Sequence, residues 1–157
     1  MKILMVCLGN ICRSPIAEGL LQQKADAANL GWTVHSAGTN GYYDGEPPHL
    51  LSQKVCKANG LDISNQVSRK LTKEDFANYD RIYAMANDVI GYMKEIGKEN
   101  FDNNKTILFL EELYPGKSMN VPDPWYGTED GYTEVFELID ATCNKIINSY
   151  LEKQTSL

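Results

Sequence analysis

The segment of the chain best suited to chemistry lies near the N-terminus, where five residues separate Cys7 from Arg13. The loop between them contains Gly9 and Asn10, which tolerate unusual backbone angles, and Pro15 suits the first turn of a following helix. Such a loop gathers backbone N–H groups around one point and adds the positive end of the helix dipole. The pattern predicts a site for a tetrahedral dianion such as phosphate, in which Arg13 grips two of the oxygens.

Cys7 is expected at the bottom of this cradle, where it would act as a nucleophile. The surrounding N–H groups and Arg13 favour the thiolate over the thiol, and Ser14 can donate a hydrogen bond to the sulfur. A thiolate that faces the phosphorus in line with the leaving oxygen would form a phosphocysteine intermediate. The residues expected to surround the phosphate are Leu8, Gly9, Asn10, Ile11, Cys12, Arg13 and Ser14.

Asp123 is the best candidate for the acid that such a reaction also requires. The leaving oxygen must be protonated as the P–O bond breaks, and a water must be activated in the second step. Pro122 and Pro124 stiffen the loop around Asp123, and a carboxyl group beside a bound dianion tends to keep its proton. Trp125 and Tyr126 follow, and could form a pocket wall for a flat aromatic leaving group. An aspartate before proline is also common in ordinary turns, so both interpretations stay open on spacing alone.

Short apolar runs alternate with helical patterns along the chain, which predicts an α/β fold. Strands are expected at residues 2–7, 33–36, 80–85 and 106–110, and helices at 15–30, 47–59, 88–97 and 132–150, with a short helix after a capping box at 72–75. Regular helices between buried strands predict parallel βαβ units in a doubly wound sheet. Ligands of such sheets lie beyond the carboxyl ends of the strands, where the segment after residue 7 begins.

Length, charge and cysteine content restrict the class of protein. With 157 residues the chain is expected to form one domain over residues 1–157. Its net charge of −6 argues against nucleic acid or anionic membranes as partners and favours a monomer. No secretory signal or membrane span is evident. Four cysteines are too few for a disulfide scaffold, so a reducing cytoplasm is the expected compartment.

Over nearly its whole length the chain resembles the low-molecular-weight protein tyrosine phosphatases. The shared segments are the loop from Cys7 to Ser14, the Ser-Ala-Gly-Thr stretch at 36–39, the Leu-Thr-Lys-Glu-Asp-Phe stretch at 71–76, and Asp123-Pro124. The resemblance implies a three-layer domain with four parallel strands flanked by helices, no metal or cofactor, and a tyrosine-phosphorylated protein as substrate.

The same resemblance assigns roles to individual residues. It implies that Cys7 is the nucleophile, Arg13 the phosphate clamp and Asp123 the general acid. It also implies that Asn10, Ser14 and Ser36 form a polar network that holds the loop in shape.

The chain departs from the family pattern at four positions. Trp125 replaces a tyrosine, and Tyr42 stands where the opposite pocket wall is often tryptophan. Gln66 replaces a histidine, and Ala86 follows Met85 where the family has aspartate. The first two changes bear on substrate preference, and the other two on the positioning of the loop.

Cys12 and the overall activity each admit alternatives. Cys12 could be a core thiol, but the resemblance favours a redox role in which oxidised Cys7 condenses with it as a disulfide. Zinc is not expected there, because no second cysteine pair or nearby histidine completes a set of ligands. Two other functions use the same loop: an arsenate reductase, which needs further relay cysteines, and a phosphotransfer module, which needs no general acid.

Overall fold

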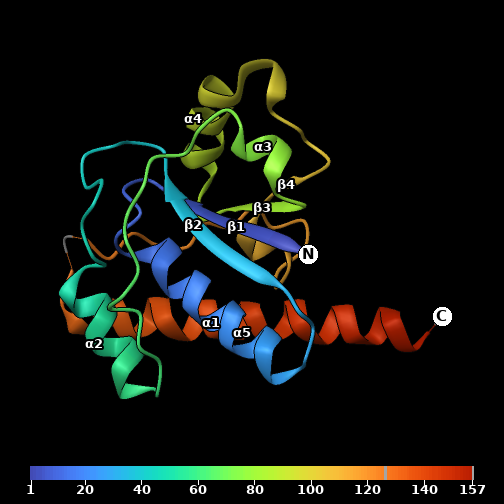
Figure 1. Ribbon diagram of the computed structural model, residues 1–157. Coiled ribbons are helices and arrows are strands. Elements are labelled where there is room, and N and C mark those ends of the chain that lie inside the picture. Colours follow the sequence, from blue (N-terminus) through green and yellow to red (C-terminus); the bar gives the residue numbers. More distant parts are fainter. Residues whose placement is uncertain (126, 157) are drawn as a thin grey trace.

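Four parallel strands form a sheet in the order β2-β1-β3-β4 in the computed structural model, which describes residues 1–125 and 127–156 (Figure 1). The strands are β1 (Lys2–Cys7), β2 (Thr33–Gly38), β3 (Arg81–Ala84) and β4 (Thr106–Leu108). The fold class predicted from the alternating pattern is confirmed.

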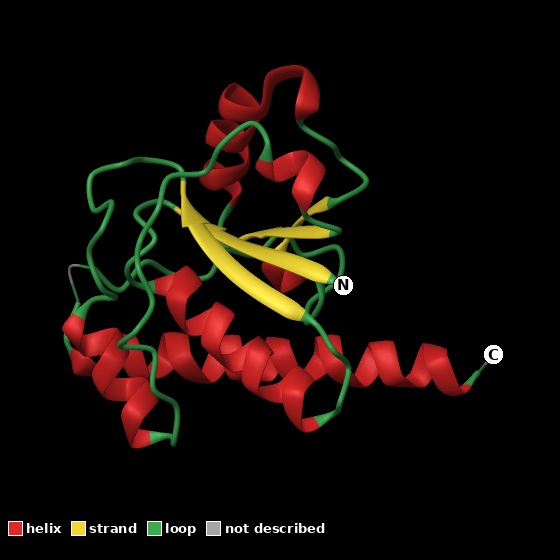
Figure 2. Cartoon of the chain, in the orientation of Figure 1, coloured by secondary structure: helices red, strands yellow, loops and turns green. Residues whose placement is uncertain are grey.

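Helices cover both faces of this sheet (Figure 2). One face carries α1 (Arg13–Ala27), α2 (Leu50–Ala58) and the long α5 (Glu129–Thr155), and the other carries α3 (Asp75–Asn78) and α4 (Asn87–Gly97). Two short 3₁₀ turns lie at Lys98–Asn100 and Phe109–Glu111. The result is three layers, with the sheet in the middle.

Strand β1 is buried on both sides because its side chains alternate between two cores. Ile3 and Met5 pack into the core under α1 and α5, whereas Leu4 and Val6 pack into the core under α3 and α4. This explains why β1 is a continuous apolar run with no polar residue between Ile3 and Val6.

The carboxyl end of β1 is the topological switch point of the sheet. The chain leaves β1 through α1 to reach β2 on one side, and later returns to β3 on the other side. Connections therefore diverge where β1 ends, which leaves a crevice at that edge. The loop after Cys7 occupies this position.

Several element boundaries differ from those expected. Helix α1 begins at Arg13, two residues before Pro15. Pro15 fits into this first turn, because the N–H that proline lacks would have no hydrogen-bond partner there. Helix α2 begins at Leu50 because the His49 side chain caps it, with Nδ1 accepting from the Leu51 N–H at 3.1 Å. Strand β4 ends at Leu108, because the apolar residues after it form a 3₁₀ turn.

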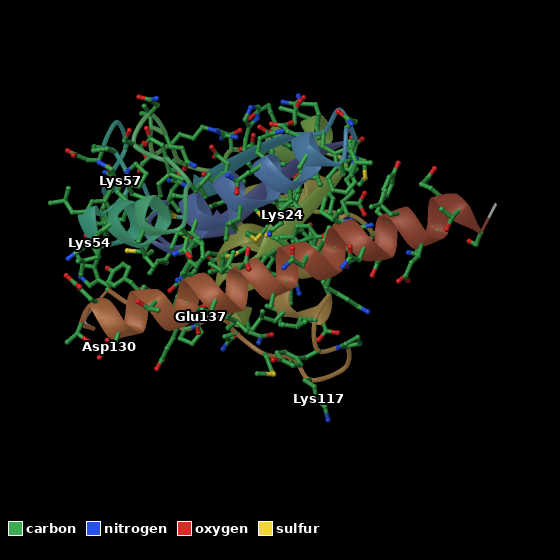
Figure 3. The ribbon with its side chains drawn as sticks, turned by 90° about the horizontal axis from the view of Figure 1, so that it is seen from below. Lys24, Lys54, Lys57, Lys117, Asp130 and Glu137 are labelled. Carbon is green, nitrogen blue, oxygen red and sulfur yellow. The ribbon has the colours of Figure 1, made fainter. Side chains whose placement is uncertain are left out.

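Helix α5 is the longest element and supports α1 along much of its length. An ion pair of 2.8 Å joins Asp140 of α5 to Lys24 of α1, and Figure 3 labels Lys24. Since Lys24 is only partly exposed, the pair adds to the apolar packing between the two helices. In the described part of the chain, no helix combines the length and the apolar character needed to cross a membrane.

Candidate functional site

The loop between β1 and α1 turns its carbonyl oxygens outward. Five carbonyl oxygens between Cys7 and Cys12 accept hydrogen bonds from groups outside the loop. Backbone N–H groups donate to three of them, from Thr39 to Cys7, from Asn40 to Leu8 and from His49 to Ile11. Hydroxyl groups donate to the other two, from Ser68 to Asn10 and from Ser52 to Cys12. In a planar trans peptide the C=O of one residue and the N–H of the next point in opposite directions. Outward carbonyls therefore direct the following N–H groups inward, which is the predicted cradle for an anion.

Two residues make this tight path sterically feasible. Asn10 adopts a left-handed conformation with φ of 59°, which asparagine tolerates better than most residues. Gly38, at the end of β2, lies so close that a Cβ there would be 2.9 Å from Asn10 N and from Leu8 O. Any side chain at residue 38 would push the loop away, so glycine is needed at that position.

The sulfur of Cys7 lies inside the loop, and the whole Cys7 residue is 3% exposed. Ser14 Oγ is 3.0 Å from Cys7 Sγ, and the Asn10 N–H donates to the same sulfur at 3.3 Å. The Asn10 N–H thus points at the sulfur, and the Ser14 hydroxyl lies within hydrogen-bond distance of it.

Hydrogen bonds join Asn10, Ser14 and Ser36. The Asn10 amide nitrogen donates to Ser14 Oγ and to Ser36 Oγ, each at 2.9 Å. The Asn10 amide oxygen accepts from the Arg69 N–H at 3.0 Å. These bonds hold the left-handed residue in place from behind the cavity.

Arg13 links the loop to the segment that carries Asp123. Its Nη1 donates to the Val121 carbonyl at 3.1 Å, and its Nη2 lies 3.7 Å from Asp123 Oδ2. The Val121 N–H in turn donates to the Met85 carbonyl at the end of β3. The Arg13 side chain is 6% exposed and that of Asp123 is 46% exposed. The guanidinium is thus held inside, whereas the carboxyl group faces the solvent side of the cavity.

A cavity of about 300 Å³ opens over the sulfur. It is lined by Cys7, Leu8, Gly9, Ile11, Cys12, Arg13, Asn40, Tyr42, Tyr43, Asp123 and Trp125. The structure therefore brings the proposed nucleophile, clamp and acid to one place, whereas Asn10, Ser14 and Ser36 support the loop from outside the lining.

The aromatic rim contains Tyr43 beside the expected Tyr42 and Trp125. Tyr42 lines the cavity but is 85% exposed. Tyr43 is the tyrosine that packs on Trp125, with ring centroids 5.5 Å apart, and a Cβ at Gly9 would lie 3.1 Å from its ring. Tyr126, a predicted wall residue, lies outside the described residues.

His49 belongs to the same aromatic cluster. Its ring lies 5.3 Å from that of Trp125 and stacks on that of Tyr132 at 5.2 Å. Sequence patterns gave no sign of this contact, because it depends on how the loop folds onto α5.

The four cysteines are all free thiols, and their surroundings differ. Burial raises the pKa of Cys12 to about 12, and its sulfur lies 3.5 Å from the Tyr132 hydroxyl. Cys56 and Cys143 are fully buried in the core, and burial raises the pKa of each. Relay cysteines of an arsenate reductase would have to reach Cys7, and neither of these two lines the cavity with it.

Two departures from the family pattern have clear positions. Gln66 Nε2 donates to the Pro15 carbonyl at 3.0 Å, and its Oε1 is buried without a partner in the described part of the chain. Ala86 is buried just before α4. Within residues 1–125 and 127–156, no group of three His, Cys, Asp or Glu side chains is placed to hold a metal ion.

Comparison with known proteins gives consistent matches over nearly the whole chain. The family model described as low molecular weight phosphotyrosine protein phosphatase matches residues 2–157. The human protein of that name is 35% identical over 154 residues, which cover 97% of this chain and 94% of the human one.

Solved structures agree with this match. A protein tyrosine phosphatase from Entamoeba histolytica with Hepes in its active site has a TM-score of 0.88 and 32% identity, covering 98% of this chain and 99% of its own. Vibrio vulnificus Wzb, solved in complex with benzylphosphonate, has a TM-score of 0.84 and 30% identity, covering 94% of this chain and 97% of its own.

Proposed function

Because the chain belongs to the low molecular weight phosphotyrosine protein phosphatase family, we propose that it hydrolyses phosphotyrosine in proteins through a phosphocysteine intermediate on Cys7. It is an enzyme of the phosphoric monoester hydrolase class. The observation that carries the mechanism is the meeting of Cys7, Arg13 and Asp123 in one cavity. Small aryl phosphates are substrates of the same site in this proposal.

In the first step the phosphate dianion occupies the cradle of N–H groups, and Arg13 pairs with two of its oxygens. The Cys7 thiolate attacks the phosphorus, so that an S–P bond forms while the P–O bond to the tyrosine breaks. Asp123, protonated at this stage, gives its proton to the leaving phenolate. The products are the free tyrosine and the phosphocysteine.

In the second step Asp123 is a carboxylate and works in the opposite direction. It takes a proton from a water molecule that attacks the phosphorus and breaks the S–P bond. Inorganic phosphate leaves, the Cys7 thiolate is restored and Asp123 is again protonated. The bond from Arg13 to the Val121 carbonyl supports this scheme, because it ties the acid-bearing loop to the phosphate clamp.

An aromatic leaving group suits the walls of the cavity. Tyr43 and Trp125 present ring surfaces on which a phenyl ring can pack. Benzylphosphonate, present in the Vibrio structure, joins a phenyl ring to a phosphonate and has the outline expected of a ligand for such a cavity. A phosphotransfer module is less well supported, since it would make no use of Asp123 beside Arg13.

The proposal is tested by turnover of p-nitrophenyl phosphate at mildly acidic pH, with a chelator in the buffer. We expect hydrolysis that follows saturation kinetics and is inhibited competitively by vanadate, which mimics the phosphate in the cradle. Phosphotyrosine peptides should be hydrolysed as well. Absence of turnover of both substrates by folded protein would contradict the proposal.

We also propose that Cys12 protects Cys7 from irreversible oxidation. Both residues line the cavity. Peroxide converts Cys7 to a sulfenic acid; the Cys12 sulfur then attacks the Cys7 sulfur, an S–S bond forms, and the hydroxyl group leaves with the Cys12 proton as water. Dithiothreitol would reduce this disulfide and restore the thiolate. The four free thiols suit a reducing, cytoplasmic compartment, which is part of the same proposal.

The Cys12→Ser variant should therefore lose activity to peroxide in a way that dithiothreitol does not reverse. Without a partner thiol, the sulfenic acid proceeds to sulfinic and sulfonic acids. The measurement is the fraction of p-nitrophenyl phosphate turnover recovered after reduction. Cys56→Ser, which changes a fully buried cysteine outside the cavity, should recover like the wild type. Equal recovery of Cys12→Ser and wild type would exclude the protective role.

A further inference from the structure

A glutamate on α1 continues the hydrogen-bond network behind the cradle. Glu18 lies one turn after Ser14, and its Oε1 accepts a hydrogen bond of 2.6 Å from the Ser36 hydroxyl. The side chain is partly buried. Burial raises the pKa of Glu18, whereas the bond from Ser36 and the charge of Arg69 act in the opposite direction. A carboxyl group kept partly from water beside the catalytic loop needs an explanation.

The hydrogens of Asn10 can be assigned without ambiguity. Its amide oxygen accepts from the Arg69 N–H, which fixes the orientation of the amide group. The two hydrogens on its Nδ2 are both used, one for Ser14 and one for Ser36. Asn10 therefore donates to both serines and accepts from neither.

Each serine then has one hydroxyl hydrogen left to donate. Ser36 gives its hydrogen to Glu18, because a carboxylate can only accept. When Cys7 is a thiolate its sulfur can only accept, so Ser14, 3.0 Å away, gives its hydrogen to that sulfur. The chain of hydrogen bonds thus ends on both sides in a negatively charged acceptor, the Glu18 carboxylate at one end and the Cys7 thiolate at the other.

We propose that Glu18 is a positioning residue for the nucleophile, which acts through Ser36, Asn10 and Ser14 so that the Ser14 hydroxyl donates to the Cys7 sulfur. The inference rests on the proposed function, since it assigns Glu18 to the reaction of Cys7. Because a carboxylate can only accept, Glu18 holds the Ser36 hydrogen on its own side and leaves Ser36 only as an acceptor for Asn10. An amide at residue 18 could instead donate to Ser36, whose own hydrogen would then turn toward Asn10 and oppose the bond from the Asn10 amide. Asn10 is then held with its second amide hydrogen on Ser14.

Other charges act on the two ends of this chain. Arg69 is the charged group that acts on Glu18, and it also pairs with Asp75 at 2.9 Å. At the other end, Cys12, Arg13 and Asp123 line the cavity with Cys7. None of these groups is replaced when residue 18 is changed to glutamine, so a comparison of Glu18→Gln with the wild type measures the effect of the carboxylate alone.

The test compares Glu18→Gln with Glu137→Gln, which removes the same charge from an exposed site on α5 (Figure 3). Two quantities are measured across the pH range: the rate of Cys7 alkylation by iodoacetate, followed by mass spectrometry, and kcat/KM for p-nitrophenyl phosphate. For Glu18→Gln we expect both to fall about 3- to 10-fold at mildly acidic pH, with the alkylation rate approaching that of the wild type at alkaline pH. Glu137→Gln should follow the wild-type profile.

A purely structural role predicts a different profile. A loop that is merely loosened would lower both quantities by the same factor at every pH, and this result, or an unchanged profile, would overturn the proposal. Because alkylation does not require turnover, the test of Glu18 stands even if the proposed phosphatase reaction fails. Thermal melting of each variant shows whether it is folded at the assay temperature, so that rates are compared only between folded proteins.

A double-mutant cycle tests the route of the effect. If Glu18 acts through Ser36, Glu18→Gln should have no further effect on Cys7 alkylation in a Ser36→Ala background, where the link from Asn10 is already broken. An undiminished effect in that background would mean that Glu18 acts directly through space, and would overturn the proposed route.

Discussion

The Cys7→Ser variant is expected to fold normally and to lose hydrolysis of p-nitrophenyl phosphate by about 10⁴-fold or more. The exchange replaces one sulfur by one oxygen in a buried position, so the packing around it changes little. A serine hydroxyl is a far weaker acid than a thiol and the neutral hydroxyl is a poor nucleophile, so attack on the phosphorus by residue 7 is lost. Turnover is measured under single and multiple turnover conditions, to separate attack by residue 7 from hydrolysis of the intermediate.

Binding distinguishes the loss of the nucleophile from the loss of the site. The cradle and Arg13 are unchanged in Cys7→Ser, so inorganic phosphate should still bind and tyrosine-phosphorylated proteins should be retained by the variant. Cys56→Ser makes the same chemical change in the core, where it should lower stability but not the turnover of the folded fraction. A Cys7→Ser variant with turnover within tenfold of the wild type, an energy difference of about 1.4 kcal/mol, would mean that another group attacks the phosphorus.

The catalytic loop could be predicted from local sequence because its determinants are close together. Gly9 and Asn10 permit the backbone path, Pro15 marks the first turn of a helix, and the apolar run before Cys7 marks a buried strand. Each signal reflects a steric or hydrogen-bond requirement that operates over a few residues. For the same reason, the order of strands and helices followed from hydrophobic periodicity.

Contacts that depend on the backbone of a distant segment have no comparable signal. The anchor of Arg13 is the Val121 carbonyl, 108 positions away in sequence, and any residue type supplies a carbonyl. The packing of Tyr43 on Trp125 depends on the path of an irregular loop without periodicity. Gly38 is required because another backbone passes within 2.9 Å of its missing Cβ, which only the assembled sheet shows.

Glu18 illustrates the same limit for side chains. Glutamate is a good helix former, and a polar residue in a helix ordinarily points to solvent. Only the position of Ser36 on the neighbouring strand β2 turns it into the end of a hydrogen-bond chain that reaches Cys7. Local sequence therefore pointed to the proposed nucleophile, whereas the groups proposed to orient it required the tertiary structure.

Replacement of Asp123 by alanine should lower kcat by about 10²- to 10⁴-fold, which is the contribution usual for general acid–base catalysis. The loss should grow as the leaving group becomes a poorer one. p-Nitrophenolate leaves without much help, whereas the phenolate of tyrosine, whose conjugate acid has a pKa of about 10, needs a proton as the P–O bond breaks. The measurement is kcat for a series of aryl phosphates, plotted against the pKa of each phenol.

The slope of this plot separates the role of Asp123 from a general effect on the site. In the wild type, protonation by Asp123 should make kcat nearly independent of the leaving group, and in Asp123→Ala kcat should fall steeply along the series. Asp44→Ala removes an exposed carboxylate from the loop that carries Tyr43, and should leave the slope unchanged. Equal losses for good and poor leaving groups in Asp123→Ala would show that this residue is not the proton donor. The 3.7 Å contact with Arg13 would then be its main contribution, because it holds the guanidinium in place for the phosphate.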